Sequence, residues 1–259
     1  MGLFSDWCVS SKTNNKRKRY WTYAEKPGTR AGITDDLVET MRSHYDRLDR
    51  IADDVARLGY EDAAEILRAV LPRTDKARSG DLGEILATEL VEEEIGLRVP
   101  VRRLRYKDGR DMALRGDDFI GAGYDKDDQL WLLKGEAKSN KTLGKTTITK
   151  AREALSKNSG RCTPDSLLFV ANRLLESDNE DDQALGRTIR DEVGRKTVPP
   201  SRIDHVLFTL SGNTPPDALK LDLDAACVDR NHYVVNVRIE DHPEFIAAMY
   251  DKVQKLGDD

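Results

Sequence analysis

The sequence is poor in cysteine and contains no long apolar segment. Its three cysteines, Cys8, Cys162 and Cys227, are odd in number and far apart, which excludes a disulfide framework and a zinc-type spacing. Such usage is typical of a reducing compartment. No apolar run is long enough to span a bilayer, and Asp6 interrupts the few apolar residues at the start, so there is no signal-peptide pattern. We therefore expect a cytoplasmic protein that makes no membrane contact.

The motifs of several enzyme classes are also missing. The sequence shows no internal repeat, no phosphate-binding glycine loop and no serine or cysteine nucleophile signature. Its length of 259 residues suits one large α/β domain, or a core domain with a small helical one. Charged residues, in contrast, make up 34% of the chain. The positions of these charged residues give the best indication of function.

An acid pair is followed closely by a buried strand that ends in an acid and a lysine. The pair is Asp117-Asp118, and the last residues of the strand are Glu136-Ala137-Lys138. Because side chains alternate along a strand, Glu136 and Lys138 point to the same face. Magnesium takes oxygen ligands, and a neighbouring ammonium can orient the attacking water. The block therefore predicts a metal-dependent hydrolytic site.

A chance arrangement of charges is the alternative. A salt bridge at a strand end contributes only ~0–1 kcal/mol, and it would not explain the acid pair. Lys138 is, however, the only lysine in the chain with an acid two positions before it. Alternation places Asp118 on the face of Ile120, so Asp118 is the expected metal ligand. The doublet alone leaves Asp117 open as a second ligand.

A further acid, Glu84, lies on a helix expected over residues 81–95. Ser79 or Asp81 can cap its start, and Gly96 is expected to stop it. Glu84 shares its face with apolar side chains at helical spacings. A carboxylate there is costly unless it is compensated, so Glu84 is predicted to face a metal-bound water or a basic partner. A partly exposed glutamate stabilised by the helix dipole is the alternative.

The expected elements follow an order known from one group of enzymes. They are the helix with Glu84, strands near 98–106, 117–122 and 129–138, and a helix near 145–158. This order resembles the core of the PD-(D/E)xK nuclease superfamily. The phrases GDLGEIL, RRLRYKDGRDMALRGDDFIGA and WLLKGEAKS also resemble the HamA family, the nuclease subunit of the Hachiman antiphage-defence system. The resemblance, over residues 79–256, implies an α/β fold with a PD-(D/E)xK nuclease-like core, a mixed central sheet flanked by helices.

The resemblance also implies roles for individual residues. Asp118 and Glu136, with the carbonyl of Ala137, would hold Mg²⁺ or Mn²⁺, and Lys138 would orient the attacking water. Glu84 would match the helix glutamate and hold a metal-bound water. The usual proline before the acid is absent. A helicase of the same defence system is implied as the controlling partner.

The charge distribution bears on DNA binding. The net charge of −5 is unusual for a protein that holds a phosphate backbone, so local basic clusters or a partner are required. Lys134, Lys141 and Lys145 surround the predicted site, and we expect them to contact nucleic acid. A solvated basic face is the alternative for each of them.

The N-terminal part differs in composition from the rest. Residues 12–23 combine five positive charges with three aromatic residues, which suits phosphate contact, base stacking or docking on a partner. A mobile basic tail is the alternative. Helices are expected over 33–57 and 60–71. We therefore expect residues 1–75 to form a basic N-terminal tail and helical prefix, and residues 76–259 to form the nuclease-like domain.

The remaining patterns complete that domain. They predict helices near 164–176 and 180–193, strands over 203–210 and 232–239, and a last helix over 243–256. The expected activity is Mg²⁺-dependent cleavage of DNA in antiphage defence. One alternative is a non-catalytic nucleic-acid-binding or regulatory subunit that retains the fold. Another is a stand-alone restriction-type endonuclease, which would need a recognition element that the sequence does not show.

Overall fold

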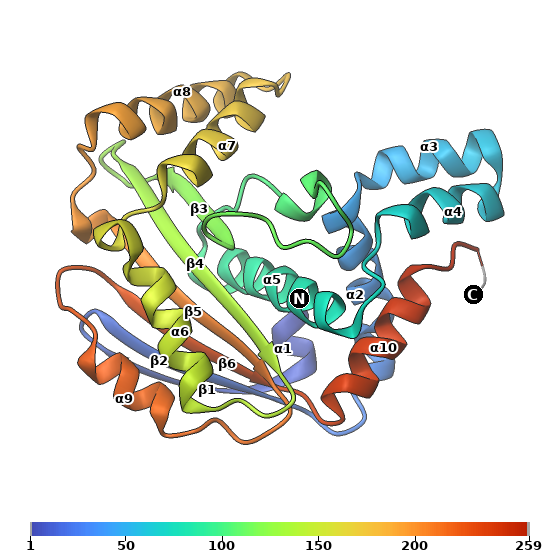
Figure 1. The fold of residues 1–259 in the computed structure, drawn as a ribbon, viewed down its shortest axis with the longest axis horizontal. Coiled ribbons are helices and arrows are strands. Elements are labelled where there is room, and N and C mark those ends of the chain that lie inside the picture. The colour runs from blue at the N-terminus through green and yellow to red at the C-terminus, as the bar shows by residue number, and fades with distance from the viewer. Residues whose placement is uncertain (1, 258–259) are drawn as a thin grey trace.

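The computed structural model describes residues 2–257 and shows a mixed α/β fold (Figure 1). Six strands form one sheet in the order β1-β2-β6-β5-β4-β3. Their bounds are β1 Cys8–Asn15, β2 Lys18–Glu25, β3 Phe119–Tyr124, β4 Leu130–Asn140, β5 Ile203–Ser211 and β6 His232–Arg238. The expected mixed sheet flanked by helices is confirmed.

The helices lie before, between and after the strands in the chain. Their bounds are α1 Leu3–Trp7, α2 Arg30–Tyr45, α3 Leu48–Leu58, α4 Tyr60–Val70, α5 Asp75–Leu90, α6 Lys145–Ser156, α7 Pro164–Leu175, α8 Glu180–Arg195, α9 Ala218–Ala225 and α10 His242–Val253. Figure 1 shows α3 and α4 beside each other at one end of the molecule, next to α10. The short helices α1 and α9 had no counterpart among the predicted elements.

The sheet is parallel in its middle and antiparallel at its two edges. Strands β2, β6, β5 and β4 run parallel, whereas the hairpin pairs β1 with β2 and β3 with β4 are antiparallel. Parallel neighbours need crossover connections, and α6, α7 and α8 lie between β4 and β5 in the chain. Only the short β3 lies outside β4, so the end of β4 is near the sheet's edge.

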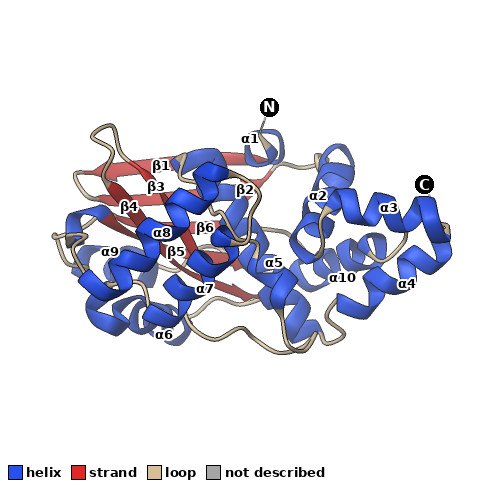
Figure 2. Ribbon diagram, turned by 90° about the horizontal axis from the view of Figure 1, so that it is seen from above, coloured by secondary structure: helices blue, strands red, loops and turns tan. Residues whose placement is uncertain are grey.

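Helices cover both faces of the sheet (Figure 2). On one face, residues of α2, α5 and α10 pack with Val206, Phe208 and Val235. On the other face, α6 and α9 cover Leu207 and Val234. Strand β5 is therefore buried on both sides, which explains the uninterrupted apolar run Val206-Leu207-Phe208 in its middle. The residues predicted for β4, β5, β6, α6, α7, α8 and α10 agree closely with the structure.

The helix that carries Glu84 begins earlier than expected. The Thr74 hydroxyl accepts a hydrogen bond from the Ala77 N–H at 3.3 Å and caps α5. The helical turns continue past α5 as far as Ile95 and stop at Gly96, whose φ of 75° is favourable for glycine. The predicted stop is therefore confirmed, and the predicted start was too late.

The strand expected over residues 98–106 is wrong. This segment is irregular apart from a short 3₁₀ turn, Arg103–Tyr106. It meets β3 through one backbone hydrogen bond, from the Ala122 N–H to the Arg98 carbonyl at 2.9 Å. The Val99 N–H donates instead to the Glu92 side chain at 2.7 Å. Because only one backbone hydrogen bond joins it to β3, the segment does not extend the sheet.

The helix expected over residues 33–57 is divided into α2 and α3. The break falls at Asp46, which has an extended backbone with φ −148° and ψ 169°. Its carboxylate accepts a hydrogen bond from the next residue, Arg47, at 2.7 Å. Aspartate side chains compete with the helical ladder in this way, and the apolar periodicity across the break concealed it.

The prediction of a basic N-terminal tail is also wrong, because residues 12–23 lie in the β1–β2 hairpin. Strand β2 pairs in parallel with β6, in the interior of the sheet. Trp21 and Tyr23 alternate with more exposed residues and are buried in the core. Phe4 and Trp7 are buried as well. The aromatic residues of this segment therefore stabilise the fold.

Candidate active site

A cavity of about 1000 Å³ opens between the start of α5, the loop before β3, the end of β4 and the start of α10. Glu84, Asp118, Ala137 and Lys138 all line it. Four of the predicted site residues thus come together from three separate parts of the chain. Glu136 lies beside them but is largely buried.

The offset between β3 and β4 creates the site. Strand β3 begins at Phe119, opposite Gly135, so the residues of β4 beyond Gly135 have an edge that β3 does not cover. The Asp118 carboxylate lies at this edge and accepts a hydrogen bond from the Ala137 N–H at 2.8 Å. The N–H and C=O of a strand residue point to the same side. The Ala137 carbonyl is therefore also directed toward the cavity.

Lys138 connects the two acids. Its ammonium donates a hydrogen bond to the Glu136 carboxylate and another to the Ala137 carbonyl at 3.1 Å. It also lies 3.8 Å from the Asp118 carboxylate. Burial lowers the pKa of Lys138, but the charges of Asp118 and Glu136 outweigh burial and raise it overall. Lys138 therefore remains a cation at the centre of the site.

Glu84 reaches the site because α5 packs closely on β4. A Cβ atom at the preceding residue, Gly83, would lie 3.2 Å from the Ser139 Cβ, so glycine permits this approach. Burial, followed by the charge of Asp118, raises the pKa of Glu84 well above its usual value. Glu84 is therefore electrostatically coupled to Asp118.

The carboxylates of the cavity destabilise one another's charged forms. Burial raises the pKa of Asp118, although Lys138 opposes it. Burial and then the charge of Asp118 raise the pKa of Glu136 to about 7. Buried acids that repel each other in this way are common at functional sites. A bound cation would relieve the repulsion.

Asp117 and Lys134 do not belong to the cavity. The Asp117 carboxylate accepts a hydrogen bond from the Thr163 N–H at 2.7 Å and lies 3.4 Å from the Lys134 ammonium. Lys134 is only 1% exposed and donates to the Lys157 and Arg161 carbonyls. Lys134 is therefore unable to reach a nucleic acid, and that prediction was wrong. Asp117 holds the start of α7 and leaves Asp118 as the member of the pair that faces the cavity.

We expect Asp117→Asn to lower the stability of the protein and Asp118→Asn to lower its activity. Asp117→Asn leaves the buried Lys134 ammonium without its charged partner, which should cost about 3–5 kcal/mol of unfolding free energy. Asp118→Asn keeps the shape of a partly exposed side chain and should leave stability nearly unchanged while removing the DNA cleavage that the sequence leads us to expect. Urea unfolding and DNA cleavage measure the two effects. Similar behaviour of the two variants would contradict the assignment.

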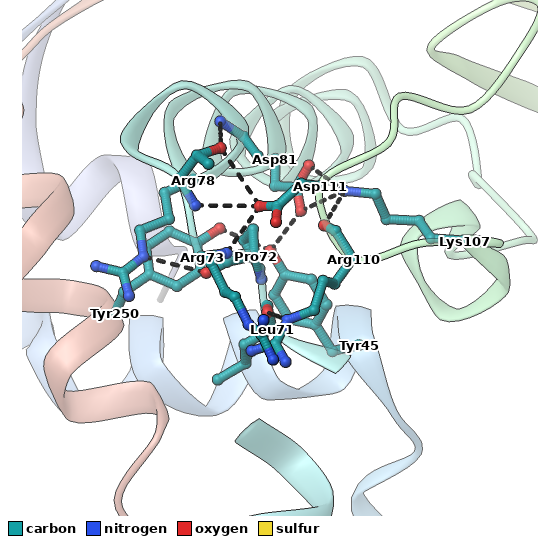
Figure 3. Close-up of polar contacts among 12 residues, drawn as sticks. Tyr45, Leu71, Pro72, Arg73, Arg78, Asp81, Lys107, Arg110, Asp111 and Tyr250 are labelled. Carbon is teal, nitrogen blue, oxygen red and sulfur yellow. Dashed lines mark hydrogen bonds and ion pairs between the residues drawn. The ribbon is translucent and has the colours of Figure 1, made fainter. Parts of the chain in front are cut away.

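The other two predicted nucleic-acid contacts remain accessible. Lys141 is exposed and lines the cavity, and Lys145 is exposed at the first residue of α6. Sequence reasoning missed Asp81, one helical turn before Glu84, whose carboxylate accepts hydrogen bonds from Lys107 at 2.8 Å and from Tyr45 at 2.8 Å (Figure 3). The spacing of three residues on α5 was the available signal.

Cys227, Asp229 and His232 form a separate cluster near the start of β6. Their donor atoms lie within 4.8 Å of one another, and within residues 2–257 no other group of three such side chains converges so closely. Arg152 Nη1, however, lies 3.2 Å from His232 Nδ1, and Arg230 pairs with Asp229 at 3.0 Å. These arginines disfavour a cation, so we assign no metal to this cluster.

The fold and the cavity define an α/β protein with a lysine-containing acidic site at the edge of a mixed sheet. The chain belongs to the HamA family, whose model matches residues 1–253. It is similar to the Hachiman protein HamA of Bacillus cereus, with 27% identity over 182 residues. The matched region covers 70% of this chain and 63% of that protein, less than two thirds of its length. The resemblance seen in the sequence is thus confirmed, and it includes the N-terminal hairpin.

No described helix is both long enough and apolar enough to cross a membrane.

Proposed function

We propose that this protein is a metal-dependent nuclease that hydrolyses phosphodiester bonds of DNA. The observation that carries the proposal is the meeting of Asp118, the Ala137 carbonyl, Glu136 and Lys138 at the uncovered edge of β4. Glu84 adds a third carboxylate from α5. A site of this composition suits phosphoryl chemistry better than recognition alone, because carboxylates repel phosphate.

The donor atoms fit a hard divalent cation such as Mg²⁺ or Mn²⁺. Asp118, Glu136 and the Ala137 carbonyl supply oxygen ligands, which these ions prefer. Burial raises the pKa of both Asp118 and Glu136 by disfavouring their charged forms, and a cation bound between them would offset this cost, which supports the proposal. When bound, such an ion polarises a phosphate oxygen and makes water a better nucleophile.

The chain's own side chains perform the remaining tasks. Lys138 lies within reach of both acids, so its ammonium can orient the attacking water and offset the negative charge that develops on phosphate. Glu84 can accept a hydrogen bond from a water molecule in the cavity. Lys141, at the rim, can bind a neighbouring phosphate of the strand.

Membership of the HamA family supports a role in Hachiman antiphage defence. We further propose that a helicase of the same system is the partner that controls cleavage. The acidic net charge of −5 supports a need for such a partner, because the chain alone has little electrostatic attraction for DNA.

Incubation of the purified protein with supercoiled and linear DNA tests this function. Cleavage is expected in Mg²⁺ or Mn²⁺ and not in EDTA, with the helicase present and absent as separate arms. Calorimetric titration with Mn²⁺ gives a second readout that does not depend on activation by a partner. Asp118→Asn should weaken Mn²⁺ binding, and Lys150→Met, an exposed change on α6, should not. Failure of the unaltered protein to bind Mn²⁺ would exclude the proposed metal site.

A further inference from the structure

The loop between the 3₁₀ turn and β3 is fastened firmly at its first end (Figure 3). The Lys107 ammonium contacts the Asp81 carboxylate, and the Arg110 guanidinium donates to the Leu71 carbonyl at 2.9 Å. The Asp111 carboxylate accepts hydrogen bonds from the N–H groups of Arg73 at 2.8 Å and Thr74 at 3.0 Å. These contacts join the loop to α5 and to the segment between α4 and α5.

The second end of the loop is fastened as well. The Arg103 guanidinium donates to the Arg115 carbonyl at 2.6 Å. The Asp117 N–H donates to the Ser166 hydroxyl at 2.8 Å, which fixes the loop to α7. Residues 112–115 therefore form a short strap between two anchored points, beside the cavity that holds the acids.

The strap presents apolar side chains to the cavity. Met112, Ala113 and Leu114 line its wall, and Met112 is 61% exposed. The Met112 side chain lies over Gly109, where a Cβ atom would come within 3.0 Å of the Met112 sulfur. An anchored loop thus holds a large apolar side chain in solvent near Asp118. Ligand cavities commonly combine an apolar wall with a few polar groups, and the strap provides such a wall.

We infer that the strap contacts an unstacked base of the bound DNA strand, which makes a strand with accessible bases the substrate of the proposed nuclease. The inference rests on the proposed function. Two exposed lysines of the cavity wall, Lys76 and Lys141, can pair with phosphates, and the strap supplies an apolar surface for the adjoining base. Methionine is flexible and polarisable, and apolar side chains are used to contact or separate bases in other complexes. In an intact duplex both faces of a base are stacked, so the contact requires an open strand.

Binding of labelled single-stranded DNA by the full-length protein in Ca²⁺, without cleavage, tests the inference. One oligonucleotide carries all its bases, and the other carries a run of abasic sites in its centre. Met112→Ala is expected to weaken binding of the complete strand by roughly 5- to 30-fold, the value of one stacked base. Binding of the abasic strand should not change. Val228→Ala, at a residue 76% exposed and outside the cavity, is the matched control and should change neither.

Each other outcome counts against the strap. Equal weakening on both strands would show a backbone or folding effect, and thermal unfolding would separate these two. No weakening on either strand would show that the strap does not touch DNA, as expected if it docks a protein instead. The assay is run at low ionic strength, where even weak attraction to phosphates gives measurable binding. If the unaltered protein binds neither strand under these conditions, the proposed function fails together with this inference, whereas failure of the inference alone leaves binding by the unaltered protein intact.

Discussion

Glu136→Gln and Lys138→Met are each expected to lower the rate of DNA cleavage by at least about 10²- to 10³-fold. Glu136→Gln removes a charged oxygen from the proposed metal site while keeping the volume of the side chain. Lys138→Met removes the ammonium that lies between Glu136 and Asp118. The rate is measured with saturating DNA, so that weaker binding does not imitate slower chemistry.

Surface changes nearby provide the controls. Glu153→Gln and Lys150→Met alter exposed residues of α6 by the same chemistry and should leave cleavage unchanged. If the control variants lose as much activity as the site variants, general charge and not the site governs the reaction. Full activity in the Glu136→Gln, Lys138→Met double variant would remove the site assignment altogether.

Stability should respond to Glu136→Gln in a pH-dependent way. The pKa of Glu136 is raised by burial and by Asp118 from 4.5 to about 7. A carboxyl group with a raised folded-state pKa favours the fold at low pH, and this contribution is lost as pH rises through about 7. Glutamine does not ionise, so the variant does not lose this stability as the pH rises. In EDTA its melting temperature should therefore equal or exceed that of the parent at pH 8.

The strand at the centre of the site was predictable because its signals are local. Alternation along β4 placed Glu136 and Lys138 on one face, and their contact in the structure agrees. Alternation did not reveal how deeply each side chain lies. Lys134 shares that face, yet the segment between α6 and α7 covers it. Its ammonium donates hydrogen bonds to the Lys157 and Arg161 carbonyls of that segment.

The acid pair was harder to interpret, since it lies in a bend before β3 begins. Gly116 has a φ of 96°, so the backbone turns there and strand alternation does not apply. Asp117 and Asp118 consequently separate toward different partners, Thr163 and the Ala137 N–H. Asp118 lines the cavity as a result of this turn and not of the assumed strand geometry.

The N-terminal hairpin was missed because its stabilising contacts are remote in sequence. Tyr20 of β2 pairs with Val234 of β6, and no local sequence pattern predicts a pairing between residues so far apart in the chain. The basic residues of the hairpin resembled a tail because most side chains of β1 after Cys8 are exposed. An edge strand with exposed lysine and polar residues is also a common protection against aggregation.

Trp7, the last residue of α1 directly before the hairpin, leads to a large expected effect on stability. Trp7→Ala should lower the free energy of unfolding by about 3–5 kcal/mol, because the fully buried indole stacks on Phe245 at 5.5 Å and donates a hydrogen bond to Glu25 at 3.0 Å. Val9→Ala, at a residue 62% exposed on β1, should change it by less than about 0.5 kcal/mol. Urea unfolding of both variants measures the difference.

Removal of residues 1–75 extends the same test to the proposed division of the chain. The deletion takes away β1, β2 and α2, exposes the edge of β6 and opens the core beneath α5 and α10. We expect the remaining chain to show no cooperative unfolding and no Mn²⁺ binding, because the helix that carries Glu84 loses its support. A shortened chain that unfolds cooperatively and binds Mn²⁺ would instead establish residues 1–75 as a separable prefix, with a role in control and none in the fold.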